Sequence, residues 1–214
     1  IILKITMKKS ISTLVFDFGG VIINLKKEQD WMFQDLLPNF EQAGLLQLHL
    51  SGYFRDLETG NITTSELLSK MESIATPENK TEQKIRQHWN AILLDIPQHR
   101  VELIKRLKQH YRLILLSNTN AIHVQSFQQY MLQTYAEDIL QENFHTVYYS
   151  QEIGLRKPEK QIYEFVMQQH GITAEEIIFF DDKAENLIAP KKLGWNTVQV
   201  PYNQLTEELV NELY

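Results

Sequence analysis

Short apolar runs of strand length alternate with helical patterns along most of this 214-residue chain. Four runs have the length and the β-branched or aromatic content of buried strands, and a fifth is weaker. They are Leu14–Phe16, Leu113–Leu116, Ile177–Phe180 and Thr197–Val200, with Thr146–Tyr149 as the fifth. Strands that alternate with helices form parallel sheets covered on both faces. The pattern therefore predicts an α/β fold with a doubly wound, Rossmann-like core.

One region interrupts this alternation. From Lys26 to about Leu94 the sequence carries only helical signals, and Thr63 with Glu66 forms a capping box at the start of one of them. The apolar positions at helical spacing are Trp31, Leu36 and Leu37, then Leu67, Leu68, Met71 and Ile74, then Ile85, Trp89, Ile92 and Leu93. We predict an α-helical cap subdomain over residues 26–94, inserted into a core made of residues 7–25 and 95–214. The cap must lie near the carboxyl end of the first strand, because the chain leaves that strand there.

Charge and cysteine content exclude several classes of function. The chain has 27 acidic residues against 21 lysines and arginines, a net charge of −6, and it has no block of basic residues. This balance argues against nucleic acid or an anionic membrane surface as the main partner. Cysteine is absent, so disulfides, thiolate nucleophiles and thiolate metal sites are excluded. No apolar run approaches the ~18 residues of a membrane helix. We expect a cytoplasmic protein, either a monomer or a homodimer.

Polar residues follow four of the predicted strands. Asp17 and Asp181-Asp182 follow two of them, Ser117-Asn118 follows another, and Lys157 precedes a predicted helix after the fifth run. Each has an ordinary explanation as a turn residue, a helix cap or a solvated lysine. The carboxyl ends of parallel strands, however, meet at one crevice. Two like charges ~4 Å apart repel by roughly 4 kcal/mol at an effective dielectric near 20. Three carboxylates there would therefore need a divalent cation with hard oxygen ligands.

These motifs, in this order and with an insertion after the first, resemble the haloacid dehalogenase-like (HAD) hydrolase superfamily. The resemblance is strongest to its bacterial branch similar to α-D-glucose-1-phosphate phosphatases. The matching stretches are Phe16–Ile22, Leu116–Asn120, Ser150–Glu159 and Phe179–Asn186, which together reach over nearly the whole chain. Each stretch is weakly diagnostic alone, and their combination is strongly so.

The resemblance implies a phosphatase that forms an aspartyl phosphate. It assigns Asp17 as the nucleophile, and covalent capture splits one difficult displacement into two easier ones. It implies Mg²⁺ bound by the Asp17 carboxylate, the Gly19 carbonyl and Asp182, with Asp181 as a further ligand or an anchor. Ser117 and Asn118, the latter through its side chain or its backbone, would bind the phosphate, and Lys157 would pair with both phosphate and Asp17. The implied substrate is a small phosphorylated metabolite such as a hexose 1-phosphate.

The chain departs from the family pattern at Gly19. Most members carry there a second aspartate, which protonates the leaving oxygen, and such a general acid contributes roughly 100 to 10,000-fold. A sugar 1-phosphate, with its acidic hemiacetal leaving group, is compatible with the loss. The departure leaves two alternatives open: a catalytically impaired relative that binds a phosphorylated ligand, and a metal-independent haloacid dehalogenase. The Asp181-Asp182 pair favours the metal-dependent phosphatase over the dehalogenase.

Substrate choice would come from the cap. The candidates are Tyr53, Phe54 and Arg55, and Trp89 with Asn90. Trp89 shares a helical face with Ile85 and Leu93, which favours a core position over a sugar platform. His123 is the one histidine that we expect near the crevice, with a surface position as the alternative.

Overall fold

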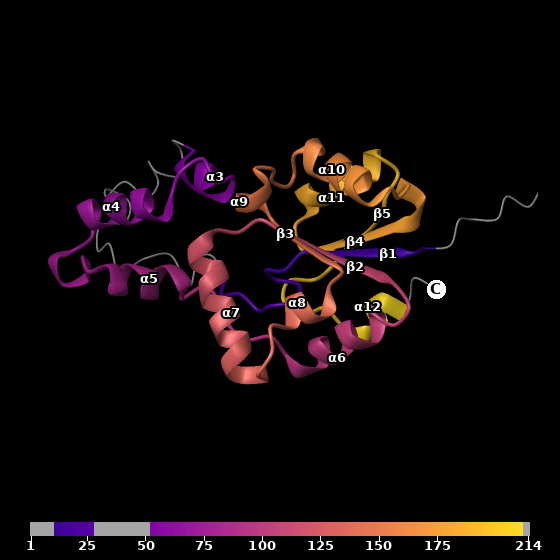
Figure 1. Cartoon of the computed structure of the whole chain (residues 1–214), viewed down its shortest axis with the longest axis horizontal. Coiled ribbons are helices and arrows are strands. Elements are labelled where there is room, and N and C mark those ends of the chain that lie inside the picture. The colour runs from indigo at the N-terminus through magenta and orange to yellow at the C-terminus, as the bar shows by residue number, and fades with distance from the viewer. Residues whose placement is uncertain (1–10, 28–51, 212–214) are drawn as a thin grey trace, which may run out of the picture.

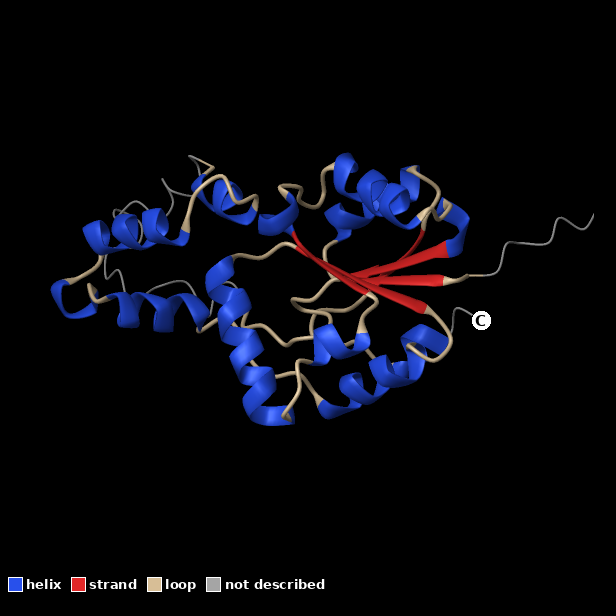
Figure 2. Ribbon diagram, viewed as in Figure 1, coloured by secondary structure: helices blue, strands red, loops and turns tan. Residues whose placement is uncertain are grey.

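The computed structural model describes residues 11–27 and 52–211, and in them it contains a five-stranded parallel sheet of order β3-β2-β1-β4-β5 (Figure 2). The strands are β1 (Thr13–Phe16), β2 (Arg112–Ser117), β3 (Thr146–Tyr149), β4 (Ile177–Asp181) and β5 (Asn196–Gln199). All five predicted runs form strands, and β5 begins and ends one residue earlier than expected. The register pairs Phe16 with Leu115 on one side and with Phe180 on the other. Asp17, Ser117 and Asp181 therefore end their strands at the same edge.

Helices cover both faces of this sheet, which confirms the predicted doubly wound core (Figure 1). One face carries α6 (Gln98–Leu107), α7 (Ala121–Tyr135), α8 (Ile139–Asn143) and α12 (Glu207–Asn211). The other carries α10 (Lys160–His170) and α11 (Ala184–Lys192). Successive residues of a strand point to opposite faces. Accordingly, Leu14 and Phe16 pack into the first layer, whereas Val15 packs into the second.

Before α6, the described part of the region between β1 and β2 contains α3 (Tyr53–Glu58), α4 (Thr64–Ile74), the 3-10 turn η1 (Pro77–Asn79) and α5 (Glu82–Asn90). These elements share an apolar cluster with Ile122 of α7. Their cluster includes Leu57, Leu67, Met71, Ile85 and Trp89. The predicted capping box is confirmed: the Thr63 hydroxyl accepts from the Glu66 backbone N–H, and the Glu66 carboxylate accepts from Thr63. The predicted helical positions Trp31, Leu36 and Leu37 lie outside the described residues. Ile92 and Leu93 follow the end of α5 rather than continuing it.

None of the helices in the described ranges is both long and apolar enough to cross a membrane.

Among the contacts that the described inserted helices make with the core, two involve α5 and α3. At the first, the Trp89 indole N–H donates to the Asn120 side-chain oxygen at 3.3 Å, and the His123 and Asn90 side chains are hydrogen-bonded at 3.0 Å. At the second, the end of α3 packs on α9 (Ser150–Ile153). Gly60 has φ +71°, and a Cβ there would lie 2.4 Å from the Gln151 carbonyl oxygen. This second contact therefore brings backbone directly against backbone.

We expect Gly60→Ala to destabilise the protein more than Gly52→Ala. Both glycines have positive φ, so both substitutions incur the ~1–2 kcal/mol that a Cβ costs in that region. No described residue lies within 4 Å of a Cβ on Gly52, whereas a Cβ on Gly60 would collide with the Gln151 carbonyl. Overpacking adds roughly 1–3 kcal/mol at Gly60 only. Urea denaturation of both variants measures the difference, and equal losses of stability would show that α3 does not pack this closely.

Candidate active site

Three carboxylates converge at the carboxyl edge of the sheet. Asp17 follows β1, Asp181 ends β4, and Asp182 follows it. Each offers a carboxylate oxygen, and these oxygens all lie within 4.8 Å of one another. The Asp17 residue is 8% exposed and Asp181 is fully buried. Buried carboxylates this close repel each other strongly unless positive charge lies among them.

Lys157 supplies a positive charge to this cluster. Its ammonium nitrogen lies 2.7 Å from Asp17 Oδ1 and 2.8 Å from Asp181 Oδ2, and the side chain is 1% exposed. Burial alone would lower the pKa of Lys157, but the two carboxylates outweigh it, so the pKa is raised. Lys157 is therefore a fixed cation that joins the ends of β1 and β4.

The two adjacent aspartates have different surroundings. Both oxygens of Asp181 are occupied: Oδ1 accepts from the Lys183 backbone N–H at 2.9 Å, Oδ2 accepts from Lys157, and the Asn186 amide donates to both at 3.0 Å. Asp182 Oδ1, in contrast, is buried with no hydrogen-bond partner among the described residues. A buried oxygen without a partner commonly marks an absent ion or water. The donor set thus fits a divalent cation.

The charges of the site lead to the same conclusion. If all three carboxylates are ionised, the single ammonium leaves the cluster with a net negative charge. Burial and the neighbouring Asp181 and Asp182 raise the pKa of Asp17 to about 7, against the lowering effect of Lys157. Burial and Asp181 also raise the pKa of Asp182. A bound dication would stabilise the ionised form of both groups.

Asn118 contacts Lys157 through its side chain. Its amide donates to the Lys157 carbonyl at 2.8 Å, and its side-chain oxygen accepts from the Lys157 backbone N–H at 2.9 Å. The carboxamide thus binds both polar groups of the Lys157 backbone. Ser117 lies at the end of β2 and is 3% exposed. This clamp was not predicted from the sequence, and neither was the hold of Asn186 on Asp181.

Gly19 and Gly20, which follow Asp17 and Phe18, are each close to a different neighbour. A Cβ at Gly20, where φ is +74°, would lie 2.8 Å from Asp182 Oδ2 and 3.1 Å from the Tyr202 ring. A side chain there would displace the Asp182 carboxylate. A Cβ at Gly19 would lie 2.9 Å from the Leu25 side chain. Among the described residues, the aliphatic side chain of Leu25 is the neighbour that a side chain at Gly19 would meet.

The cap candidates have structural partners. Trp89 is 2% exposed and stacks on Phe54 at 5.5 Å, which confirms its core position. The His123 ring stacks on Trp89 at 5.9 Å, and burial lowers the pKa of His123 to about 3. The imidazole is therefore neutral and belongs to the cap–core contact. The Tyr53 hydroxyl donates to the Glu66 carbonyl. Arg55 pairs with Glu159 of the core at 2.7 Å.

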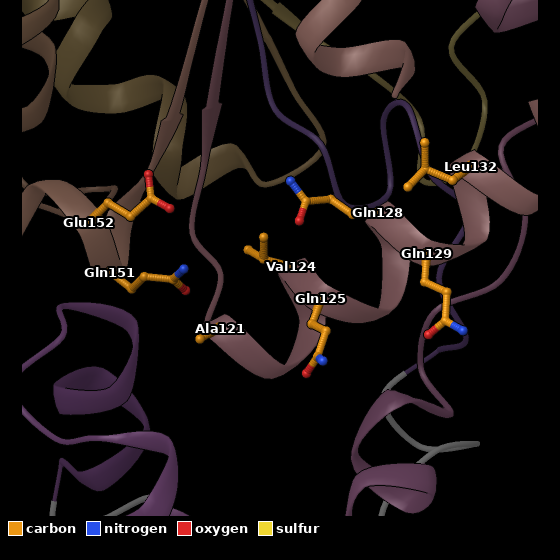
Figure 3. A pocket seen from close by; sticks show the side chains of 8 residues that line it. All are labelled: Ala121, Val124, Gln125, Gln128, Gln129, Leu132, Gln151 and Glu152. Carbon is orange, nitrogen blue, oxygen red and sulfur yellow. The ribbon is translucent and has the colours of Figure 1, made fainter. Parts of the chain in front are cut away.

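A hollow of about 500 Å³ lies between α7 and α9 (Figure 3). Glutamine side chains, Glu152 and apolar groups of α7 line it. The lining residues are Ala121, Val124, Gln125, Gln128, Gln129, Leu132, Gln151 and Glu152. None of the carboxylates around Lys157 belongs to this lining, so the hollow is separate from the carboxylate cluster.

Comparison with known proteins identifies the family. The haloacid dehalogenase-like hydrolase family matches residues 11–194, and the chain belongs to it. It is 26% identical over 196 residues to a D-ribitol-5-phosphate phosphatase from Bacteroides thetaiotaomicron, covering 88% of this chain and 91% of the relative. It is also 27% identical over 182 residues to a sesquiterpene phosphatase from Aspergillus oryzae, covering 84% and 85%.

Solved structures share the whole architecture. A HAD-family enzyme from Bacteroides thetaiotaomicron, in complex with magnesium and inorganic phosphate, has a TM-score of 0.79 and 28% identity, with 94% of this chain and 99% of that chain covered. A HAD-like hydrolase from Porphyromonas gingivalis has a TM-score of 0.78 and 27% identity, with 95% and 97% covered. The L-2-haloacid dehalogenase of Xanthobacter autotrophicus, at 16% identity and a TM-score of 0.57, shares the fold alone. The two named sequence relatives are phosphatases, and neither is a glucose-1-phosphate phosphatase.

In metal-free buffer, we expect Asp17→Asn to gain stability relative to the wild type as pH rises from about 4 to about 7. The folded-state pKa of Asp17 lies above its unfolded value, so the folded state binds more protons in this window and its stability falls as they leave. The asparagine has no proton to lose. Urea denaturation at several pH values in the presence of chelator measures the difference. Parallel pH profiles of wild type and variant would contradict the raised pKa, and the exposed Glu185→Gln serves as the control.

Proposed function

We propose that this protein is a Mg²⁺-dependent phosphatase of small phosphorylated metabolites that acts through an aspartyl phosphate on Asp17. The observation that carries the proposal is the pairing of two features at one strand edge. Asp17 is buried against a fixed lysine, and Asp182 beside it has a buried oxygen with no partner. The phosphate complex of the related Bacteroides enzyme supports the same chemistry.

One oxygen of Asp17 is available as the nucleophile. Oδ1 is bound to the Lys157 ammonium at 2.7 Å and accepts from the Phe18 backbone N–H at 2.7 Å. Oδ2 then forms the bond to phosphorus while the bond to the leaving oxygen breaks. Gly19 offers no side-chain proton, so the leaving oxygen takes its proton from a water molecule or from a residue of the cap. A water molecule then attacks phosphorus, the bond to Oδ2 breaks, and Asp17 is regenerated as a carboxylate. The proton that this water releases restores the group that protonated the leaving oxygen.

The cation would be held by Asp17, the Gly19 carbonyl and Asp182. When bound, Mg²⁺ supplies charge stabilisation to the phosphoryl oxygens and orients the phosphate in line. Asp181 would not bind the cation directly, because both of its oxygens already accept hydrogen bonds from Lys157, Asn186 and the Lys183 N–H. Ser117 and the Asn118 backbone would donate to the phosphate, and Lys157 would pair with it.

The substrate class is a phosphate monoester of a small sugar or sugar alcohol. Two observations point to different members of this class. The lack of a proton donor at Gly19 favours an acidic leaving group, as in a hexose 1-phosphate. The relative named for D-ribitol 5-phosphate favours a primary alkyl phosphate. Rates on these two substrates separate the two alternatives, and we expect the enzyme to act in the cytoplasm as a monomer or homodimer.

The inert alternative keeps one specific observation in its favour. A protein without a general acid could bind a phosphorylated ligand and turn it over poorly, and the space beside Gly19 is filled by Leu25. The dehalogenase alternative needs no cation, and the unpartnered oxygen of Asp182 argues against it.

We expect Mg²⁺-dependent phosphate release from a panel containing hexose 1-phosphates and ribitol 5-phosphate, and its loss in Asp17→Asn. Removing the nucleophile of a covalent mechanism costs on the order of 10³-fold or more in kcat. Glu185→Gln, which removes an exposed carboxylate close in sequence to the aspartate pair, should retain wild-type turnover. Phosphate binding without turnover would establish the inert protein. Chloride release from haloacids without metal would establish the dehalogenase.

Asp182 and Asp181 should respond differently to metal. Saturating Mg²⁺ raises the free energy of unfolding of a protein that binds it, by ~2.7 kcal/mol at one hundred times Kd. We expect Asp182→Asn to abolish this stabilisation, because it removes a metal-facing oxygen. Asp181→Asn should retain a stabilisation while losing stability in metal-free buffer, because Lys157 loses one of its two carboxylates. Thermal denaturation with Mg²⁺ and with chelator measures both. If Asp181→Asn instead abolished the stabilisation by Mg²⁺ and Asp182→Asn retained it, Asp181 would be the metal ligand.

A further inference from the structure

Two ion pairs cross from the cap to the loop that carries Lys157. Glu58 in α3 accepts from Arg156 Nη2 at 2.8 Å and from its Nε at 3.0 Å. Arg55, one turn earlier in α3, donates to Glu159 at 2.7 Å. Arg156 and Glu159 flank Lys157 in the sequence, one immediately before it and the other two residues after. The cap therefore holds this loop on both sides of the buried lysine.

The two pairs differ in exposure. The side chains of Arg156 and Glu58 are 26% and 28% exposed, whereas those of Arg55 and Glu159 are 63% and 33% exposed. Water and salt screen a half-buried pair less than an exposed one. The guanidinium of Arg156 also places two N–H groups on one oxygen of Glu58, which fixes its orientation. The pair between Glu58 and Arg156 is therefore the stronger constraint on the loop.

Backbone packing places α3 where these pairs can form. α3 lies beside α9, directly before the loop (Figure 1). The close approach of Gly60 to the Gln151 carbonyl brings the end of α3 onto α9. The Thr59 carbonyl oxygen lies 3.9 Å from where a Cβ on Gly154 would sit, at the beginning of the same loop. Because Gly60 has no side chain, the two segments approach closely enough for the charged groups to meet.

The core holds Lys157 on the opposite side. Asn118 binds both the N–H and the carbonyl of the Lys157 backbone. The backbone of Lys157 is thus bound by the loop after β2, its ammonium by two carboxylates, and its sequence neighbours by the cap. Only the last of these three sets of contacts comes from the inserted region.

We propose that Glu58 and Arg156 are positioning residues that make the placement of Lys157 depend on the cap. The expected effect of this ion pair on kcat rests on the proposed function. Its expected effect on the motion of the loop does not. With the pair intact, the ammonium group stays between Asp17 and Asp181. With the pair broken, the loop around Lys157 fluctuates more, and the ammonium spends less time at Asp17.

The test compares Glu58→Gln, Arg156→Gln and the charge swap E58R/R156E with the wild type. Hydrogen exchange followed by mass spectrometry reports on the backbone amides of residues 154–159. We expect faster exchange in both single variants, unchanged exchange in β4, and slower exchange in the swap than in either single variant. The control is Glu82→Gln, which breaks a similar pair with Arg86 inside α5 without touching the loop. It should leave the exchange of this segment unchanged.

The kinetic arm uses the substrate that the panel identifies. We expect kcat to fall about twofold to fivefold in each single variant, the range set by one partly exposed ion pair, with a smaller change in KM and partial recovery in the swap. Raising the salt concentration should lower kcat of the wild type more than kcat of Glu58→Gln, which keeps only the pair between Arg55 and Glu159. A role confined to stability would lower the melting temperature and leave kcat unchanged, which would overturn the proposal.

The two arms also separate this proposal from the proposed function. If the wild type releases no phosphate from any substrate, the proposed function fails, and the exchange arm still decides whether the pair holds the loop. Unchanged exchange over residues 154–159 in both single variants would overturn the positioning role, whatever the activity.

Discussion

The contact of one buried ammonium with two buried carboxylates organises the whole site. Lys157 reaches Asp17 at the end of β1 and Asp181 at the end of β4, two neighbouring strands of the sheet. A buried ion pair is weak evidence for stability, and removing one partner is costly because it leaves a charge uncompensated. The arrangement is better understood through its chemistry. It fixes Asp17 Oδ1, keeps Oδ2 available, and leaves a net negative charge that a dication would balance.

Adjacent carboxylates acquire separate tasks here from their surroundings. Asp181 accepts hydrogen bonds from an ammonium, an amide and a backbone N–H, and for this reason we propose it as the anchor. Asp182, one residue further, has left the strand and keeps an oxygen without a partner. Gly20 makes room for that carboxylate, since any Cβ there would collide with it. The backbone between β1 and the cap is therefore shaped by a residue more than 160 positions away in the chain.

The sequence predicted those features that follow from pattern and register. Apolar runs located all five strands, and the meeting of their carboxyl ends predicted the convergence of Asp17, Asp181 and Asp182. It could not predict which oxygens would be occupied, because that depends on side-chain pairs such as Asn118 with Lys157, 39 residues apart. The ion pair of Glu58 with Arg156 spans 98 residues and leaves no periodic signal. The core position of Trp89 could be predicted, because its spacing from Ile85 and Leu93 places it on an apolar helical face.

The absence of an acid at Gly19 and the hold of the cap on Lys157 bear on the same step. When no side chain protonates the leaving oxygen, the remaining assistance to departure is charge stabilisation on the phosphoryl group. That assistance depends on distance, because an interaction between charges in a site shielded from water weakens as they separate. Displacement of Lys157 from Asp17 would therefore slow catalysis more in this site than in a site that also has a general acid. On this argument, holding Lys157 from both the core and the cap compensates for what Gly19 lacks.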